Sequence, residues 1–160
     1  MKKTLLSISL ASLTSMLAGP VMTMEQRPIL TLDLAKKIAA GCEEIAKKQG
    51  WKMNIAIFDS GGNEKYFLRQ DDAFLKSILI AQMKASTSAG LPFSTKQLGR
   101  IVASTPGIAF VPGLVTFEGG LPIMTSDGKH IGAIGVSGGT GEQDGICAQT
   151  GIDGVKDDLK

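Results

Sequence analysis

The sequence has few aromatic residues and a single histidine. Aromatic residues make up 5% of its 160 residues, and the chain contains one tryptophan, one tyrosine and one histidine, His130. It also lacks a cluster of basic residues with aromatic residues between them, the pattern typical of a nucleic-acid-binding surface. These absences argue against nucleic acid as a partner. Glycine, in contrast, occurs 20 times, which indicates short strands joined by tight turns.

The chain also lacks an apolar run that is long enough for a good membrane span. Its most apolar run, TLLSISLASLTSMLAG, follows Lys2 and Lys3 and is too short and too rich in serine to span a bilayer. We interpret residues 1–23 as a secretory signal peptide, with cleavage expected after Thr23, and a buried first helix is the alternative. The mature protein would then be periplasmic or secreted. Because the chain has 17 basic and 15 acidic residues, loss of the two lysines leaves no formal net charge.

Apolar periodicity and turn residues predict an α+β fold of a single domain. Helical spacing and capping residues predict helices over residues 31–50, 73–89, 94–104 and 141–155. Strands are expected at 51–58, 64–68, 114–117, 121–126 and 129–138. The turns DSGGN and DG each join two neighbouring strands, so we predict hairpins and an antiparallel sheet with helices on its faces.

The stretch GVSGGTGEQDG, residues 135–145, matches the G-x-S-x-G pattern of serine hydrolases at its start. A hydrolase needs a histidine to accept the proton of Ser137, and His130 precedes this serine on the same predicted strand. The stretch also lacks the lysine of a phosphate-binding loop. Glu142 and Asp144 lie in the first turn of the helix that follows, where they are expected to interact with its dipole and to repel phosphate. We therefore reject the serine hydrolase and predict a strand-to-helix turn with Thr140 at the helix N-cap. A turn that also lines a ligand pocket is the alternative.

Three ordered segments resemble the GlcG/HbpS family of haem-binding and haem-degrading domains. They are GGLPIMTSDGKHIGAIGVSGGTGEQDGICA, NIAIFDSGGNEKYFLRQDDA and IAQMKASTSA, and the resembling domain covers residues 30–156. The resemblance implies a profilin-like fold, a homo-oligomer, and weak binding of haem or a related tetrapyrrole as the cofactor.

The resemblance also implies a binding site. Thr87 in KAST matches the haem-contacting threonine of the family, and Lys84 would then pair with a propionate. Arg69 and Asp71 lie at the hairpin end that borders the pocket in the family. Asp72 stands where the family has glycine, which is expected to cost backbone freedom and adds a negative charge. Lys84 and Thr87 lie with Ser77 and Ser88 on one face of the predicted helix 73–89. The alternative explanation for these polar residues is that this face is exposed to solvent. No metal site is predicted, because the histidine that some members carry in the first helix is absent here. His130, the sole histidine, is interpreted as a solvated residue on a strand.

Two other classes of function remain open. One is a small-molecule enzyme that uses Lys84, Arg69 and Asp71 for acid–base chemistry, and the other is a structural or stress-sensing oligomer without a small ligand. No catalytic residue is assigned.

The chain has two cysteines, Cys42 and Cys147. In a profilin-like fold the first and last helices pack side by side, and an oxidising compartment would allow a disulfide between them. Two buried free thiols are the alternative.

Overall fold

The computed structural model describes residues 27–160, so the predicted signal peptide lies outside the described residues. The chain forms four α-helices, four strands and two 3₁₀ helices in this part. In chain order the elements are α1 (Leu32–Gln49), β1 (Asn54–Asp59), β2 (Glu64–Arg69), α2 (Ser77–Gly90), α3 (Thr95–Ser104), η1 (Pro106–Phe110), β3 (Gly120–Met124), β4 (His130–Ser137), α4 (Gly141–Asp153) and η2 (Lys156–Leu159).

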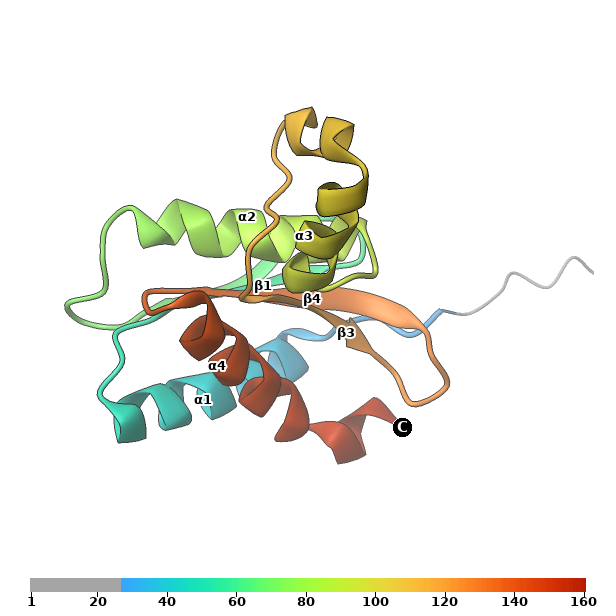
Figure 1. The fold of residues 1–160 in the computed structure, drawn as a ribbon. Helices are drawn as coiled ribbons and strands as arrows, with labels where there is room; N and C mark the ends of the chain where they lie inside the picture. The colour runs from blue at the N-terminus through green and yellow to red at the C-terminus, as the bar shows by residue number, and fades with distance from the viewer. Residues whose placement is uncertain (1–26) are drawn as a thin grey trace, which may run out of the picture.

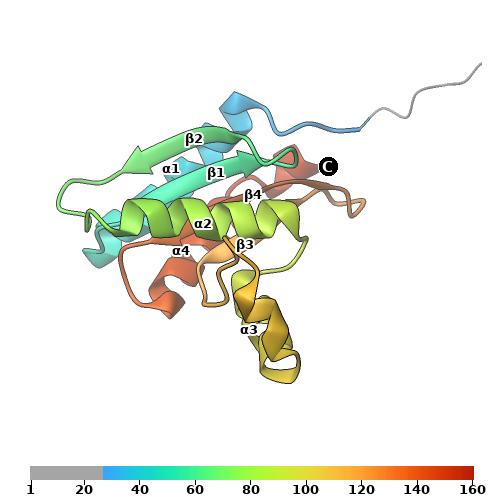
Figure 2. The ribbon, with the colours of Figure 1, turned by 90° about the horizontal axis from the view of Figure 1, so that it is seen from above.

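The four strands form one antiparallel sheet in the order β2-β1-β4-β3. Helices α1 and α4 cover one face of this sheet and α2 covers the other (Figure 1). Seen from above, α2 runs across β1 and β4, while α3 extends away from the sheet (Figure 2). The predicted α+β class and the antiparallel sheet are therefore confirmed. No helix within residues 27–160 is long and apolar enough to cross a membrane.

Local sequence explains where the helices begin. Thr31 caps α1 by accepting a hydrogen bond from the backbone N–H of Leu34, and Gly50 ends this helix in the left-handed conformation. Thr140 caps α4, and Gln143 returns a hydrogen bond to it, which completes a capping box. The N-caps of both helices were predicted at these residues.

The two faces of the sheet are packed differently. The face toward α1 and α4 carries large apolar side chains such as Ile57, Ile134 and Val136. The face toward α2 carries small residues, and Ala56 packs there against Ala81 and Ala85. A Cβ atom at Gly135 would lie 2.1 Å from the carbonyl oxygen of Ala81. This glycine of the G-x-S-x-G pattern therefore allows α2 to lie directly on β4.

A disulfide joins Cys42 of α1 to Cys147 of α4, with their Cα atoms 4.5 Å apart. The two helices pack side by side on one face of the sheet, as predicted, and the bond connects residues 105 positions apart in the chain. Of the two alternatives for these cysteines, the structure has the disulfide.

Two predicted elements differ from the structure. Residues 114–117 form no strand, because the N–H of Val115 donates to the side chain of Thr87 on α2 and not to a neighbouring strand. Helix α2 begins at Ser77 and not at Ala73, because local turns at residues 71–72 and 75–76 precede the helix. The prediction was wrong at both places because apolar patterning alone does not show these backbone hydrogen bonds, one of which is tertiary and the others local.

Candidate functional site

The polar residues on one face of α2 lie in the interior of the protein. The side chains of Ser77, Lys84, Thr87 and Ser88 are all buried. The alternative interpretation, in which these residues form a face exposed to solvent, is therefore wrong. Each of these residues must be explained by what it contacts beneath the helix.

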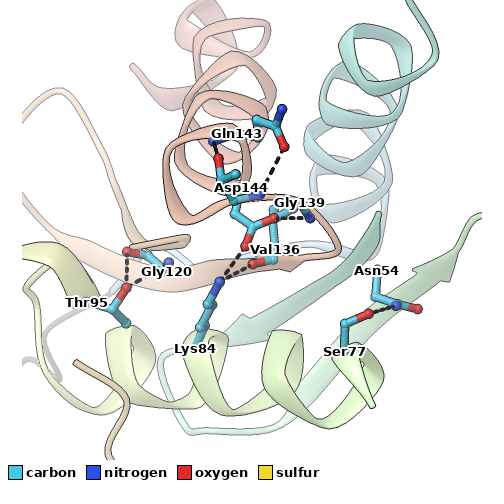
Figure 3. Close-up of polar contacts among 10 residues, drawn as sticks. Asn54, Ser77, Lys84, Thr95, Gly120, Val136, Gly139, Gln143 and Asp144 are labelled. Atoms are coloured by element: carbon cyan, nitrogen blue, oxygen red, sulfur yellow. Dashed lines mark hydrogen bonds and ion pairs between the residues drawn. The ribbon is translucent and has the colours of Figure 1, made fainter. Parts of the chain in front are cut away.

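Lys84 forms a buried ion pair with Asp144 of α4. The lysine Nζ lies 2.7 Å from Asp144 Oδ2 and also donates to the carbonyl oxygen of Val136 at 2.9 Å (Figure 3). The other carboxylate oxygen of Asp144 accepts from the backbone N–H of Gly139 at 3.0 Å. The two side chains are 1% and 3% exposed. The pair thus ties α2 to the turn that precedes α4.

Burial acts on both members of this pair. It lowers the pKa of Lys84, and the hydrogen bond and charge of Asp144 partly offset that shift. It raises the pKa of Asp144, and the hydrogen bond from Lys84 again opposes the shift. Each residue therefore depends on the other for its charged form. Asp144 had been expected to interact with the dipole of α4 and to repel anions there, but it points inward.

The segment before β3 covers the Lys84 side chain. The Nζ atom lies 4.9 Å from the centroid of the Phe117 ring, within range of a cation–π contact. Gly119 has a φ of +124°, and a Cβ atom there would lie 2.6 Å from Lys84 Nζ. A larger residue at this position would therefore disrupt the ion pair.

Thr87 lies three residues further along α2 and holds the same covering segment. Its Oγ1 accepts from the N–H of Val115 at 3.0 Å and donates to the carbonyl oxygen of Gly113 at 3.4 Å. Lys84 and Thr87 are thus close to one another, and both lie beneath residues 113–117. Contact between Thr87 and a ligand remains a prediction.

Arg69 and Asp71 lie at the opposite end of α2. Asn54, the partner of Arg69 in the sheet, donates to Ser77 at the start of α2. At 1.5 Å per residue, Ser77 and Lys84 are roughly 10 Å apart along the helix. Arg69 and Asp71 line a separate hollow of about 320 Å³. The described structure therefore does not bring Lys84 together with Arg69 and Asp71, as the acid–base enzyme would require.

The residue that follows Asp71 has unusual backbone geometry. Asp72 has a φ of 63° and is the one non-glycine residue with a positive φ in the described part of the chain. The left-handed region favours glycine, so a backbone cost at this position was correctly predicted.

A further hollow opens at the C-terminal end of α2. It has a volume of about 490 Å³, and its lining includes Gly90 of the helix, Ser60 of the first hairpin turn and the neighbouring residues Lys129 and His130. Arg27, Pro28 and Ala89 complete the lining. The imidazole Nε2 of His130 is shielded from solvent and has no hydrogen-bond partner.

Sequence reasoning had treated His130 as a solvated residue on a strand. The structure places it half-buried at the start of β4, beside the end of α2. Ser137 ends the same strand, seven residues or roughly 23 Å away, so the two residues do not form a catalytic pair.

No group of three histidine, cysteine or carboxylate side chains suited to a metal ion occurs among residues 27–160.

The sequence model of the family described as haem-degrading protein HbpS-like matches residues 30–153. This protein belongs to the HbpS-like family. Protein GlcG of Escherichia coli K12 is 39% identical to it over 116 residues, which cover 71% of this chain and 85% of GlcG. The resemblance noted in the sequence is thus confirmed.

Solved structures agree with this assignment. A double mutant of HbpS from Streptomyces reticuli has a TM-score of 0.76 and 33% identity, covering 85% of this chain and 96% of that one. The crystal structure of a PduOC:heme complex has a TM-score of 0.72 and 30% identity, covering 79% of this chain and 95% of that one.

Proposed function

We propose that this protein binds haem, or a related tetrapyrrole, weakly and outside the cytoplasm. The observation that carries the proposal is the similarity to the PduOC:heme complex, which extends over 95% of that chain at a TM-score of 0.72. Membership of a family described as haem-degrading supports the same ligand class.

The hollow at the C-terminal end of α2 is a candidate place for such a ligand. Its volume of about 490 Å³ lies within the range of about 300–1,000 Å³ that is usual for small-molecule sites. Its lining includes the cations of Lys129 and Arg27, which could attract acidic groups of a ligand. A bound haem would supply an iron centre whose reactivity depends on its axial ligand. Weak binding follows because most of the lining residues are exposed.

The residues implied by family resemblance are a second part of the proposal. Thr87 is one helical turn from Gly90, so it lies near the end of α2 where the hollow opens. The Lys84 ammonium is already bonded to Asp144, and binding a propionate would require it to exchange that partner. Arg69 and Asp71 could contact only a ligand that binds at the N-terminal end of α2.

Export is proposed from two features. Residues 1–23 have the pattern of a signal peptide, and disulfides such as Cys42–Cys147 persist in oxidising compartments. N-terminal sequencing of protein from the periplasm or medium tests the proposal, with Met24 expected as the first residue. An uncleaved chain in the cytoplasm would contradict it.

A homo-oligomer is proposed from exposed apolar side chains at the start of α2. Phe74 is 71% exposed and Leu75 is 75% exposed, and Leu79 follows on the helix. Burial of these side chains against another copy would be favourable. Light scattering during gel filtration should give a mass well above 16.8 kDa, and a monomer would contradict the proposal.

The main proposal is tested by titrating the protein with ferric haem and, separately, with iron-free protoporphyrin. The protein must carry no histidine tag, because a tag would itself bind haem. We expect a saturable shift of the Soret band, and tighter binding of haem than of the iron-free porphyrin if iron contributes. Spectra equal to those of haem in buffer would contradict the proposal.

A further inference from the structure

The hollow that Arg69 and Asp71 line lies between the C-terminal part of α1 and the end of β2. The connection from α1 to β1, with Trp51 and Lys52, forms another of its walls. Its volume of about 320 Å³ is near the lower end of the range of about 300–1,000 Å³ that is usual for small-molecule sites. The hollow therefore suits a small ligand, such as a single sugar ring.

Gln70 presents hydrogen-bond donors to this hollow from a fixed position. Its side chain is 9% exposed, and its Oε1 atom accepts from the backbone N–H of Met53 at 2.8 Å. This bond identifies the two ends of the amide, because a backbone N–H can donate only to the oxygen. The Nε2 group remains accessible and has no hydrogen-bond partner within residues 27–160. A ligand oxygen in the hollow would thus meet a donor that is already held in place.

Other side chains add donors to the same hollow. Arg69 donates to the carbonyl oxygen of Ala73 at 3.2 Å through one guanidinium nitrogen, which leaves its other N–H groups available. In the described part of the chain, the Lys52 ammonium and the Trp51 indole N–H have no partner. Guanidinium and ammonium groups form strong hydrogen bonds with carboxylates. The excess of donors therefore favours an acidic ligand.

The charges of the hollow and one acceptor narrow the ligand class. Glu43 is already paired with Lys47 at 2.8 Å. The charges left for a ligand are those of Lys52, Arg69 and Asp71, which are two cations and one carboxylate with a net charge of +1. Asp71 has no partner among residues 27–160, and an ionised carboxylate only accepts hydrogen bonds. A ligand with one carboxylate and a hydroxyl group balances the charge and supplies the donor for Asp71.

We propose that this hollow binds a hydroxylated carboxylic acid of the size of a single sugar ring. The ligand carboxylate accepts from Gln70 Nε2 and from the Arg69 guanidinium, and a ligand hydroxyl group donates to Asp71. The indole of Trp51 provides an apolar wall for the C–H groups of the ligand. This ligand class goes beyond the haem proposed above, and the site lies at the opposite end of α2 from the hollow considered for haem.

Trp51 allows binding at this hollow to be followed directly. It is the single tryptophan of the chain, so a change in tryptophan fluorescence reports on the hollow that it lines. D-Glucuronate, which carries a carboxylate and hydroxyl groups, should give a saturable change at constant ionic strength. D-Glucose lacks the carboxylate and cyclohexanecarboxylate lacks the hydroxyl groups, so both should bind at least about tenfold more weakly. No saturable response to glucuronate, or equal binding of the three compounds, would overturn the proposal.

Two variants test the residues. Gln70→Glu keeps an oxygen for the N–H of Met53 but replaces the amide donors with a second carboxylate oxygen, which repels the ligand at neutral pH. Arg69→Gln removes the guanidinium. Each should bind glucuronate at least about tenfold more weakly, whereas Arg100→Gln on the exposed part of α3 is the matched control and should bind like wild type. Thermal unfolding without ligand checks that each variant is folded. Folded Gln70→Glu and Arg69→Gln proteins that bind like wild type would refute the assignment.

Discussion

The Nζ atom of Lys84 lies 2.7 Å from the Oδ2 atom of Asp144, although 60 residues separate them in the chain. Both side chains are almost completely buried, one on α2 and the other at the start of α4. The pair therefore connects helices on opposite faces of the sheet. It shows that the lysine of the KAST segment has a structural partner within the chain itself.

Breaking this pair should be costly. Lys84→Met leaves an unpaired buried carboxylate and Asp144→Leu an unpaired buried ammonium, so each should lower the free energy of unfolding by about 3–5 kcal/mol. The double variant should cost less than the sum of the two, by roughly 1–3 kcal/mol. Urea unfolding of all four proteins measures this coupling.

The exposed pair Lys37–Asp158, with a separation of 2.9 Å, provides the matched control. Its coupling energy should stay below about 1 kcal/mol. Strictly additive effects of the Lys84 and Asp144 substitutions would show that the buried pair is not coupled.

The disulfide should contribute substantially to stability. By the chain-entropy relation, a bond that closes a loop of 105 residues stabilises the folded state by about 4–5 kcal/mol. We expect Cys42→Ala/Cys147→Ala to unfold at a much lower urea concentration. Mass spectrometry after alkylation should find no free thiol in unreduced wild-type protein. Two alkylated cysteines under those conditions would contradict the bond.

Relief of backbone strain at Asp72 should stabilise the protein. Asp72→Gly is expected to raise the free energy of unfolding by about 0.5–1 kcal/mol, because glycine adopts a φ of 63° without the cost of a Cβ atom. Asp71→Gly is the control. Asp71 does not have a positive φ, so glycine there adds only freedom to the unfolded chain and should not stabilise it. Equal effects of the two substitutions would refute the explanation.

The family resemblance assigns Thr87 to the haem site. Substitutions of similar size test whether its hydroxyl group contributes to haem binding. Thr87→Val removes the acceptor for the N–H of Val115, while Thr87→Ser keeps it. If the hydroxyl group also contacts haem, Thr87→Val should weaken haem binding about fivefold, the equivalent of one lost hydrogen bond to the ligand of about 1 kcal/mol, and Thr87→Ser should bind like wild type. Haem titrations of both variants measure this. If Thr87→Val also binds like wild type, the residue carried over from the family is not part of the site.

Local patterns in the sequence predicted most of the fold. Thr31, Gly50 and Thr140 mark helix ends through contacts with residues close in the chain, so their roles can be recognised without a structure. The DG turn likewise specified the hairpin of β3 and β4. The absence of a strand at residues 114–117 was not predictable, because it depends on a hydrogen bond to Thr87, 28 residues away.

The candidate site was less predictable for the same reason. Lys84 and Thr87 were singled out as polar residues on an apolar helix, but their partners come from distant segments. His130 has no local motif, and the hollow that it lines is formed by the end of α2, the first hairpin turn and the residues before α1. Only the folded chain brings these three segments together.

The claim that this protein binds haem is tested most directly by absorption spectroscopy during a titration of the untagged protein with ferric haem. We predict a saturable shift of the Soret band, because haem that enters a protein site leaves bulk water. Spectra that equal those of haem in buffer at every protein concentration would contradict the account.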